Sequence, residues 1–216
     1  MNKVNSWALV TGGSSGIGLE FSRQLAADHY NVILASRDED KLAVAARQLR
    51  QEYQVEVETI SVDLANAKDV ERLIARICDE NRPVEMLVND AGFAVHDSLL
   101  TEDTSRQMAA FAVMAEAILK LSGAAARTMI ARGEGRIINV ASTSAWLFAG
   151  NYSALKRWVV VYTESLALEL RGTGVAATVV CPSWVKTNFH RSAGADRPDV
   201  PRRLSASATT MVKSPS

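Results

Sequence analysis

The sequence predicts an α/β protein with a doubly wound parallel sheet, arranged in three layers with helices on both faces. Two observations carry this prediction. Short apolar runs alternate with segments of helical periodicity along most of the chain, and a glycine-rich turn follows the first apolar run. Such alternation implies right-handed crossovers and a parallel sheet that is covered on both faces. A length of 216 residues suits one domain of this kind, or at most two small ones.

The elements can be followed in order along the chain. Six apolar runs are predicted strands: residues 7–10, 31–36, 55–62, 86–88, 136–140 and 176–181. Helices are predicted after the glycine-rich turn and over residues 38–53, 65–80, 104–131 and 152–170. Beyond residue 200 neither a further helix nor a seventh strand is indicated, so we expect the sheet to lack its last edge strand. We expect residues 1–190 to form the domain and residues 191–216 a short, partly irregular tail with a mobile end.

Composition argues against several classes of function. Lysine plus arginine equals aspartate plus glutamate at 24 each, so binding to nucleic acid or an anionic membrane lacks its main driving force. The longest uncharged run, between Arg136 and Lys156, contains several polar residues and is a poor candidate for a membrane span. Two distant cysteines argue against a disulfide framework or a zinc site. The N-terminus leaves no room for a signal peptide, and we expect a soluble cytoplasmic protein.

The glycine turn, residues 11–18 (TGGSSGIG), lies between the first predicted strand and the first predicted helix. A pyrophosphate group needs free backbone N–H groups at a helix N-terminus, and glycines let the backbone approach it closely. The spacing is neither the GxGxxG fingerprint nor a P-loop. The alternative is a tight strand-to-helix turn that uses glycine for steric reasons alone.

Four ordered motifs resemble the short-chain dehydrogenase/reductase family. They are the glycine turn, Asn89-Asp90-Ala91-Gly92 after the fourth strand, Tyr152-Ser153-Ala154-Leu155-Lys156 in a helix, and Cys181-Pro182 with Thr187 after the sixth strand. The resemblance implies a Rossmann-type sheet and an oxidoreductase that transfers a hydride between NADP(H) and an alcohol or carbonyl group. It places the cofactor against Gly12, Ser14, Ser15, Gly16, Ile17, Gly18, Ser36, Arg37, Asp63, Leu64, Asn89, Ala91, Gly92, Tyr152, Lys156, Pro182, Val185 and Thr187.

The end of the second strand indicates which nicotinamide cofactor is used. In a Rossmann unit an acid there binds the ribose 2′-hydroxyl, whereas an arginine accommodates a 2′-phosphate. Ser36 takes the place of the acid and Arg37 follows, which favours NADP(H). The alternative for Arg37 is a solvated charge, and Asp38 could still serve a ribose hydroxyl, so NAD(H) use stays open. The resemblance places Asp63 and Leu64 at the adenine, although Asp63 equally suits an N-cap of the following helix.

The candidate chemistry rests on Tyr152 and Lys156, which lie one helical turn apart on one face of a helix. A phenol is a poor acid or base at neutral pH, and a nearby lysine cation should lower its pKa. The tyrosine could then protonate a carbonyl oxygen whose carbon receives hydride from the cofactor, or accept the proton in reverse. By the resemblance, Ser142 would bond the substrate oxygen, with Ser144 a nearby rival, and Lys156 would also bind the nicotinamide ribose.

The chain departs from the family pattern at three positions. Met114 stands where the family usually has an asparagine that helps to hold a water in a proton relay. A thioether cannot donate a hydrogen bond, and we expect Met114 to pack in the core. Asp90 replaces an asparagine and Ser183 a glycine, either of which could shift loops near the nicotinamide. The departure at Met114 and the short C-terminus support an alternative function, a catalytically weak or inactive nucleotide-binding protein with a binding or regulatory role.

Substrate and partners are indicated in outline only. Six apolar side chains are expected near the cleft: Phe93, Trp146, Leu147, Phe148, Trp184 and Phe189. They suggest a small, apolar or aromatic carbonyl substrate, with core packing the alternative for each. Neither His96 nor His190 has the spacing of a metal ligand, so no metal is expected. The helix over residues 152–170 is apolar around much of its circumference, which predicts a homodimer through the two long helices.

Overall fold

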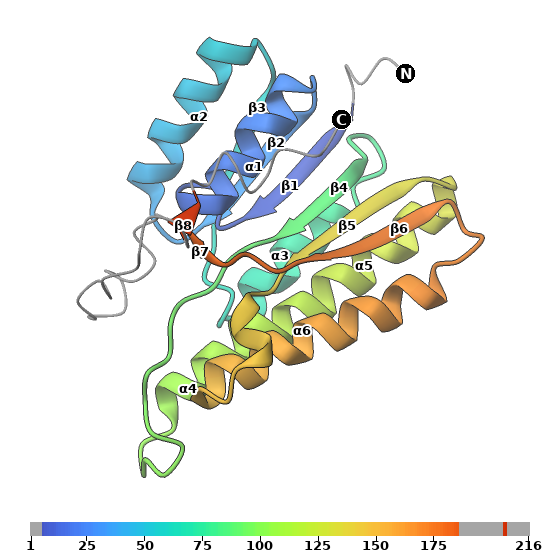
Figure 1. The fold of residues 1–216 in the computed structure, drawn as a ribbon. Coiled ribbons are helices and arrows are strands. Elements are labelled where there is room, and N and C mark those ends of the chain that lie inside the picture. The colour runs from blue at the N-terminus through green and yellow to red at the C-terminus, as the bar shows by residue number, and fades with distance from the viewer. Residues whose placement is uncertain (1–5, 186–204, 207–216) are drawn as a thin grey trace.

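A computed structural model describes residues 6–185 and 205–206 of the chain. Its centre is a parallel sheet of six strands in the order β3-β2-β1-β4-β5-β6 (Figure 1). The strands are β1 (Trp7–Thr11), β2 (Asn31–Ser36), β3 (Val57–Ser61), β4 (Val84–Asn89), β5 (Gly135–Val140) and β6 (Val175–Val180). The predicted doubly wound α/β fold is confirmed, and within the described residues no seventh strand joins this sheet.

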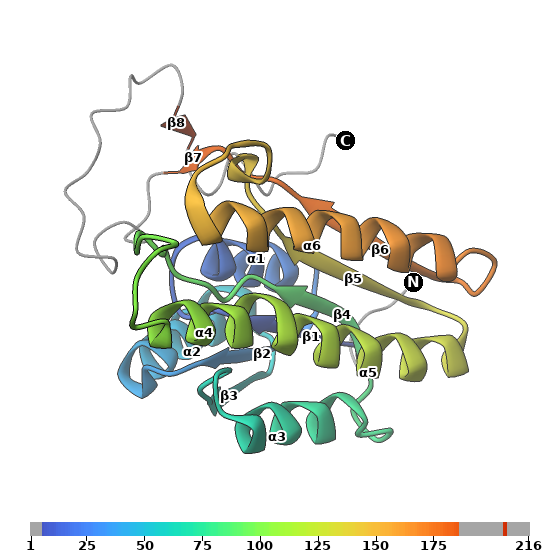
Figure 2. The same cartoon turned by 90° about the horizontal axis from the view of Figure 1, so that it is seen from below.

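Helices form a layer on each face of the sheet, as Figures 1 and 2 show. One layer consists of α1 (Gly16–Ala27) and α2 (Glu39–Tyr53). The other contains α3 (Ala67–Ile77), α5 (Ala117–Arg132) and α6 (Gly150–Glu169). A short 3₁₀ helix, η2 (Thr143–Trp146), lies between β5 and α6. The three layers match the architecture that the sequence predicts.

Buried side chains form a separate core on each side of the sheet. Successive residues of a strand point to opposite faces. In β1, Ala8 and Val10 pack with α1 and α2, whereas Leu9 packs with α3 and α5. Residues of α2 at helical spacing, such as Leu42 and Leu49, complete the first core. Apolar residues that alternate along the strands and apolar residues at helical spacing in the helices therefore meet in the two cores.

The long helix predicted over residues 104–131 is present but is not uniform. It consists of α4 (Ser105–Phe111), a π-helical turn η1 (Ala112–Glu116) and α5. Met114 lies in the π turn and is completely buried, which confirms the expected core role. Among the described residues, the stretch Ser105–Arg132 is the one that is long and apolar enough to cross a membrane. Half of its most apolar window is buried, and we assign it to the core of this fold.

The start of α3 differs from the prediction because another residue caps it. Asn66 is the N-cap, and its side chain accepts a hydrogen bond from the Lys68 backbone N–H at 2.9 Å. The N-cap alternative for Asp63 is therefore wrong. The Asp63 side chain accepts instead from the Ala65 backbone N–H at 3.0 Å, which holds the turn before the helix.

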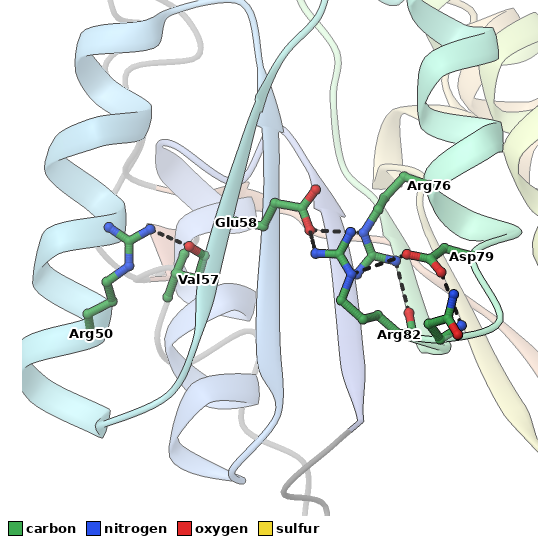
Figure 3. A network of polar contacts seen from close by, with 7 residues as sticks. Arg50, Val57, Glu58, Arg76, Asp79 and Arg82 are labelled. Atoms are coloured by element: carbon green, nitrogen blue, oxygen red, sulfur yellow. Dashed lines mark hydrogen bonds and ion pairs between the residues drawn. The ribbon is translucent and has the colours of Figure 1, made fainter.

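An ion-pair network ties α3 to the sheet near the strand starts (Figure 3). Arg76 Nε lies 2.9 Å from Glu58 Oε2, and Arg82 Nη1 lies 3.1 Å from the same oxygen. The guanidinium carbon of Arg76 is 5.1 Å from the centre of the Trp7 ring. Because the Arg76 side chain is only 6% exposed, water screens its pair with Glu58 weakly. The network therefore contributes to the attachment of α3 to β1 and β3.

A second, two-stranded sheet pairs β7 (Trp184–Val185) in parallel with β8 (Ser205–Ala206). This pairing was not predicted, because two residues carry no usable period, and it is compatible with the expected partly irregular tail. The rest of the tail lies outside the described residues.

Candidate active site

The carboxyl ends of β1, β4 and β5 meet at one edge of the sheet, where the strand order reverses. The chain places β2 and β3 on one side of β1 and then crosses to place β4 on the other side. The register sets Thr11 beside Asn89, and Asn89 beside Asn139. Ligands of doubly wound sheets bind at such a reversal. The glycine turn, the segment 89–92 and Ser142 all follow these strand ends.

The glycine turn joins β1 to α1 where larger side chains would not fit. Gly12 and Gly16 have φ angles of 70° and 59°, which favour glycine. A Cβ atom on Gly18 would lie 2.5 Å from the Gly12 carbonyl oxygen, so any other residue would displace the turn. Ser15 stands at the N-cap of α1 without a side-chain cap bond, while Ser14 and Ile17 are half-buried in the same turn. The steric alternative therefore accounts for the glycines. The first turn of α1 also suits a bound anion, because no side chain caps its backbone N–H groups.

The end of β2 lies beside the glycine turn, because β1 and β2 pair along their whole length. The Ser36 hydroxyl oxygen is buried, and it has no hydrogen-bond partner within the described part of the chain. Arg37 next to it is exposed. Asp38 is engaged elsewhere, since its Oδ1 accepts from the Lys41 backbone N–H at 3.0 Å and its Oδ2 pairs with Lys41 Nζ at 2.5 Å. These contacts hold the pKa of Asp38 below its ordinary value.

Two residues that were predicted to contact the cofactor turn their side chains into the fold. Leu64 is buried in the core that includes α3 and α5. Asn89 is buried as well, and its Nδ2 donates to Asn139 Oδ1 at 2.8 Å and to Ser122 Oγ at 3.1 Å. These side chains tie the strand ends to each other and to α5. Only the backbone groups of Leu64 and Asn89 are therefore suited to meet a ligand.

The loop after β4 is held from two sides. Thr11 Oγ1 accepts hydrogen bonds from the backbone N–H groups of Asp90 at 3.1 Å and Ala91 at 3.2 Å. A Cβ atom on Gly92 would lie 3.0 Å from Met114 Sδ, so the buried thioether packs directly against this loop. Sequence reasoning missed Thr11. The feature that could have identified Thr11 is a hydroxyl residue at the last position of β1, directly before the glycines.

The three predicted catalytic residues come together at this edge. Lys156 of α6 is buried, and its Nζ donates to the Val140 carbonyl oxygen at 2.8 Å. The same Nζ lies 5.7 Å from the centre of the Tyr152 ring. The side chains of Tyr152 and Ser142 are hydrogen-bonded to each other. The rival Ser144 instead donates its backbone N–H to Ser142 Oγ at 3.1 Å.

Burial is the largest cause of the pKa shifts of Lys156 and Tyr152. It lowers the pKa of Lys156 to about 8, against the opposing effects of Asp90 and Cys181. It raises the pKa of Tyr152 to about 12; the hydrogen bond with Ser142 lowers that pKa and the charge of Asp90 raises it. The prediction that Lys156 brings the Tyr152 pKa below its ordinary value is therefore wrong for this structure, because desolvation of the phenolate outweighs other effects. At neutral pH Tyr152 carries its proton and Lys156 is mostly charged.

Comparison with known proteins identifies the family. The family model for short chain dehydrogenase matches residues 6–198. The chain belongs to the short-chain dehydrogenase/reductase family. A putative ketoacyl reductase of Streptomyces coelicolor is 35% identical over 190 residues, which cover 83% of this chain and 70% of that protein. A galactitol 2-dehydrogenase of Cereibacter sphaeroides is 37% identical over 191 residues, which cover 84% of this chain and 72% of that protein.

A solved structure agrees with this assignment. A short-chain dehydrogenase from Sphingobium yanoikuyae in complex with NADPH is similar with a TM-score of 0.90 at 27% identity, over 96% of this chain and 81% of that chain. The present short-chain dehydrogenase/reductase is an NAD(P)-dependent oxidoreductase that acts on alcohol or carbonyl groups of small molecules.

In this dehydrogenase/reductase the predicted residues after β6 are described in part. Pro182 is buried, and its carbonyl oxygen accepts from the Thr143 backbone N–H at 3.0 Å, which holds the end of β6 to the loop of Ser142. Val185 lies in β7. Thr187 lies outside the described residues. In the described ranges, no cluster of three histidine, cysteine or acidic residues could hold a metal ion.

Several of the apolar residues expected near the substrate are open to solvent. Trp146, Leu147 and Phe148 are 55%, 59% and 109% exposed, so the core alternative is wrong for these three. Phe93 is half-buried and packs against the core. Trp184 contributes its backbone to β7, and Phe189 lies outside the described residues.

Proposed function

We propose that this dehydrogenase/reductase reduces the carbonyl group of a small, apolar ketone or aldehyde with NADPH, and catalyses the reverse oxidation with NADP⁺. The observation that supports the proposal is the hydrogen bond between the Tyr152 and Ser142 side chains, with Lys156 Nζ 5.7 Å from the centre of the Tyr152 ring. A phenol held between a hydroxyl and a buried cation is suited to proton transfer at an oxygen atom.

In the proposed reduction, Tyr152 donates its hydroxyl proton to the carbonyl oxygen as that oxygen gains negative charge. Ser142 binds the same oxygen through its hydroxyl and stabilises the developing charge. Lys156 stabilises the phenolate that remains, and the Val140 carbonyl keeps the ammonium in place. NADPH, when bound, supplies the hydride.

The residues at the strand ends fit NADP(H) better than NAD(H). The buried Ser36 hydroxyl has no partner among the described residues, and a 2′-phosphate would supply one. The exposed guanidinium of Arg37 would neutralise that phosphate. Asp38 is already paired with Lys41, so it is a poor ligand for the free ribose hydroxyl of NAD(H). The Sphingobium yanoikuyae relative, which was solved with NADPH, supports the same preference.

The glycine turn fits the pyrophosphate of such a cofactor. Glycine at positions 12 and 18 lets the turn pack closely against Ala91 and Asp90, and α1 begins there without a side-chain cap bond. Backbone N–H groups and the positive end of the helix dipole favour an anion there. We therefore assign the pyrophosphate to Gly12, Ser14, Ser15, Gly16, Ile17 and Gly18.

We infer an apolar substrate from the side chains that follow Ser142. Trp146, Leu147 and Phe148 are consecutive apolar side chains that are all largely exposed. An apolar substrate would remove part of this surface from water and gain free energy by doing so.

The function is tested by turnover of the full chain with NADPH. Ketones and aldehydes of increasing apolar size are offered beside polar sugars of similar size, and the loss of NADPH absorbance is followed. We expect turnover whose kcat/KM rises with apolar size. Measurable NADPH binding without turnover in either direction would overturn the proposal and favour the nucleotide-binding alternative. A preference for the sugars would overturn the assignment of an apolar substrate.

We also propose a homodimer through the two long helices. Leu119 of α5 is 49% exposed, and Val161 and Leu168 of α6 are 48% and 56% exposed. A second copy of the chain would bury these side chains in a symmetric interface. Val161→Glu should convert the dimer to a monomer in sedimentation experiments, whereas Val44→Glu, on α2 and 51% exposed, should leave it unchanged. A monomeric unmodified chain would overturn the proposal.

A further inference from the structure

Asp90 lies between the glycine turn and the catalytic lysine. It directly follows β4, whose neighbours in the sheet are β1, which leads into the glycine turn, and β5, which ends at the lysine contact Val140. A Cβ atom on Gly18 would lie 2.8 Å from Asp90 Oδ2, and the Gly18 backbone N–H donates to the carboxylate. The Asp90 backbone is held in turn by Thr11 Oγ1. The carboxylate is therefore fixed in position, and the proposed mechanism assigns it no task.

The titratable groups near this carboxylate come from α6 and from the segment after β6. A Cβ atom on Gly92, two residues after Asp90, would lie 3.8 Å from Lys156 Nζ, so this lysine of α6 reaches the loop of Asp90. Lys156 and Tyr152 also both respond to the charge of Asp90. Cys181, after β6, also faces Lys156, but burial raises the pKa of its thiol, so it is uncharged at neutral pH. Met114 of η1 presents a neutral thioether to the same loop. Among the described residues, Asp90 is therefore the negative charge that acts on both members of the catalytic pair.

We propose that Asp90 is a positioning residue whose fixed carboxylate keeps Tyr152 and Lys156 protonated until carbonyl reduction begins. The inference rests on the proposed function. A negative charge next to both groups stabilises the ammonium and destabilises the phenolate, so each group keeps its proton to a higher pH. Burial raises the pKa of Asp90 itself to about 6, which leaves it ionised at neutral and alkaline pH, where it is needed.

The charge of Asp90 raises the pKa of Lys156 and the pKa of Tyr152, and both effects favour the protonation state that reduction needs. The reaction requires a protonated Tyr152 and a charged Lys156, so its rate falls as the pH rises past the first proton to be lost. That proton belongs to Lys156, because its pKa is about 8 whereas that of Tyr152 is about 12. Removing the charge of Asp90 lowers both pKa values. The alkaline limit of activity must then move to lower pH.

The variant Asp90→Asn removes the charge and keeps both the size of the side chain and an oxygen that accepts from Gly18. We expect the alkaline limb of kcat/KM for ketone reduction to move to lower pH by on the order of one pH unit. Asp97→Asn is the matched control, since Asp97 lies in the same loop, 3.7 Å from Arg106, and is not among the charges that shift the pKa of Lys156 or Tyr152. An unmoved limb, or a uniform loss of activity at every pH, would overturn the proposal.

A second measurement reads the proton of Lys156 without turnover. In NMR of the full chain with isotope-labelled lysine, the resonance that titrates near the pKa of about 8 is identified by its loss in Lys156→Arg. We expect Asp90→Asn to lower its midpoint, and an unchanged midpoint would overturn the proposal. If the unmodified chain reduces no carbonyl compound, the proposed function fails, whereas this titration still decides the electrostatic role of Asp90.

Discussion

Replacing Arg37 by alanine should weaken NADPH binding and leave NADH binding nearly unchanged. A hydrogen bond to a charged group contributes about 1.5–3 kcal/mol. Arg37 is exposed, so solvent and salt screen its charge, and we expect the lower end of that range. About 1.5 kcal/mol corresponds to roughly a tenfold rise in the Kd of NADPH. NADH has no 2′-phosphate, and its Kd should change far less.

The assay is a fluorescence titration of each nicotinamide into the full chain, at low and at high salt. Arg47→Ala is the matched control, because Arg47 is an exposed arginine on the neighbouring helix α2 and its removal changes the net charge equally. The preference for NADPH that Arg37 confers should shrink as salt rises. Equal losses for both cofactors in Arg37→Ala would refute a direct contact with the 2′-phosphate.

Two further substitutions test the proton donor and the fold. Tyr152→Phe should lower kcat for reduction by about 10²–10⁴ and leave the Kd of NADPH unchanged, because it removes only the proton donor; retained turnover would contradict the mechanism. Arg76→Ala should lower the free energy of unfolding in urea by about 2–4 kcal/mol, because it breaks a largely buried ion pair with Glu58 and a contact with Trp7. Arg72→Ala, on the same helix with a side chain that is 58% exposed, should cost less than about 1 kcal/mol, and equal costs would rule out burial as the reason.

The layers of the fold could be predicted because their signals are local. Each strand shows as an apolar run and each helix as a period, and the six predicted strands all occur in the sheet. The π turn η1 was not predicted, because one additional residue in a turn barely alters the helical period. Helix α3 starts later than predicted because Asn66 is its N-cap. Asp63 and Asn66 both belong to the residue types that favour an N-cap, so the sequence could not decide between them.

The identity of the site residues was already present in the sequence, whereas their orientation and protonation were not. The motifs named Ser142, Tyr152 and Lys156, and the structure brings all three together. Motifs could not tell that Asn89 points inward, since that depends on partners about 30–50 residues away along the chain that only folding brings near. Nor could they tell that Tyr152 keeps its proton well above neutral pH or that Asp90 acts on it, because the desolvation and the charge that set a pKa come from neighbours in space.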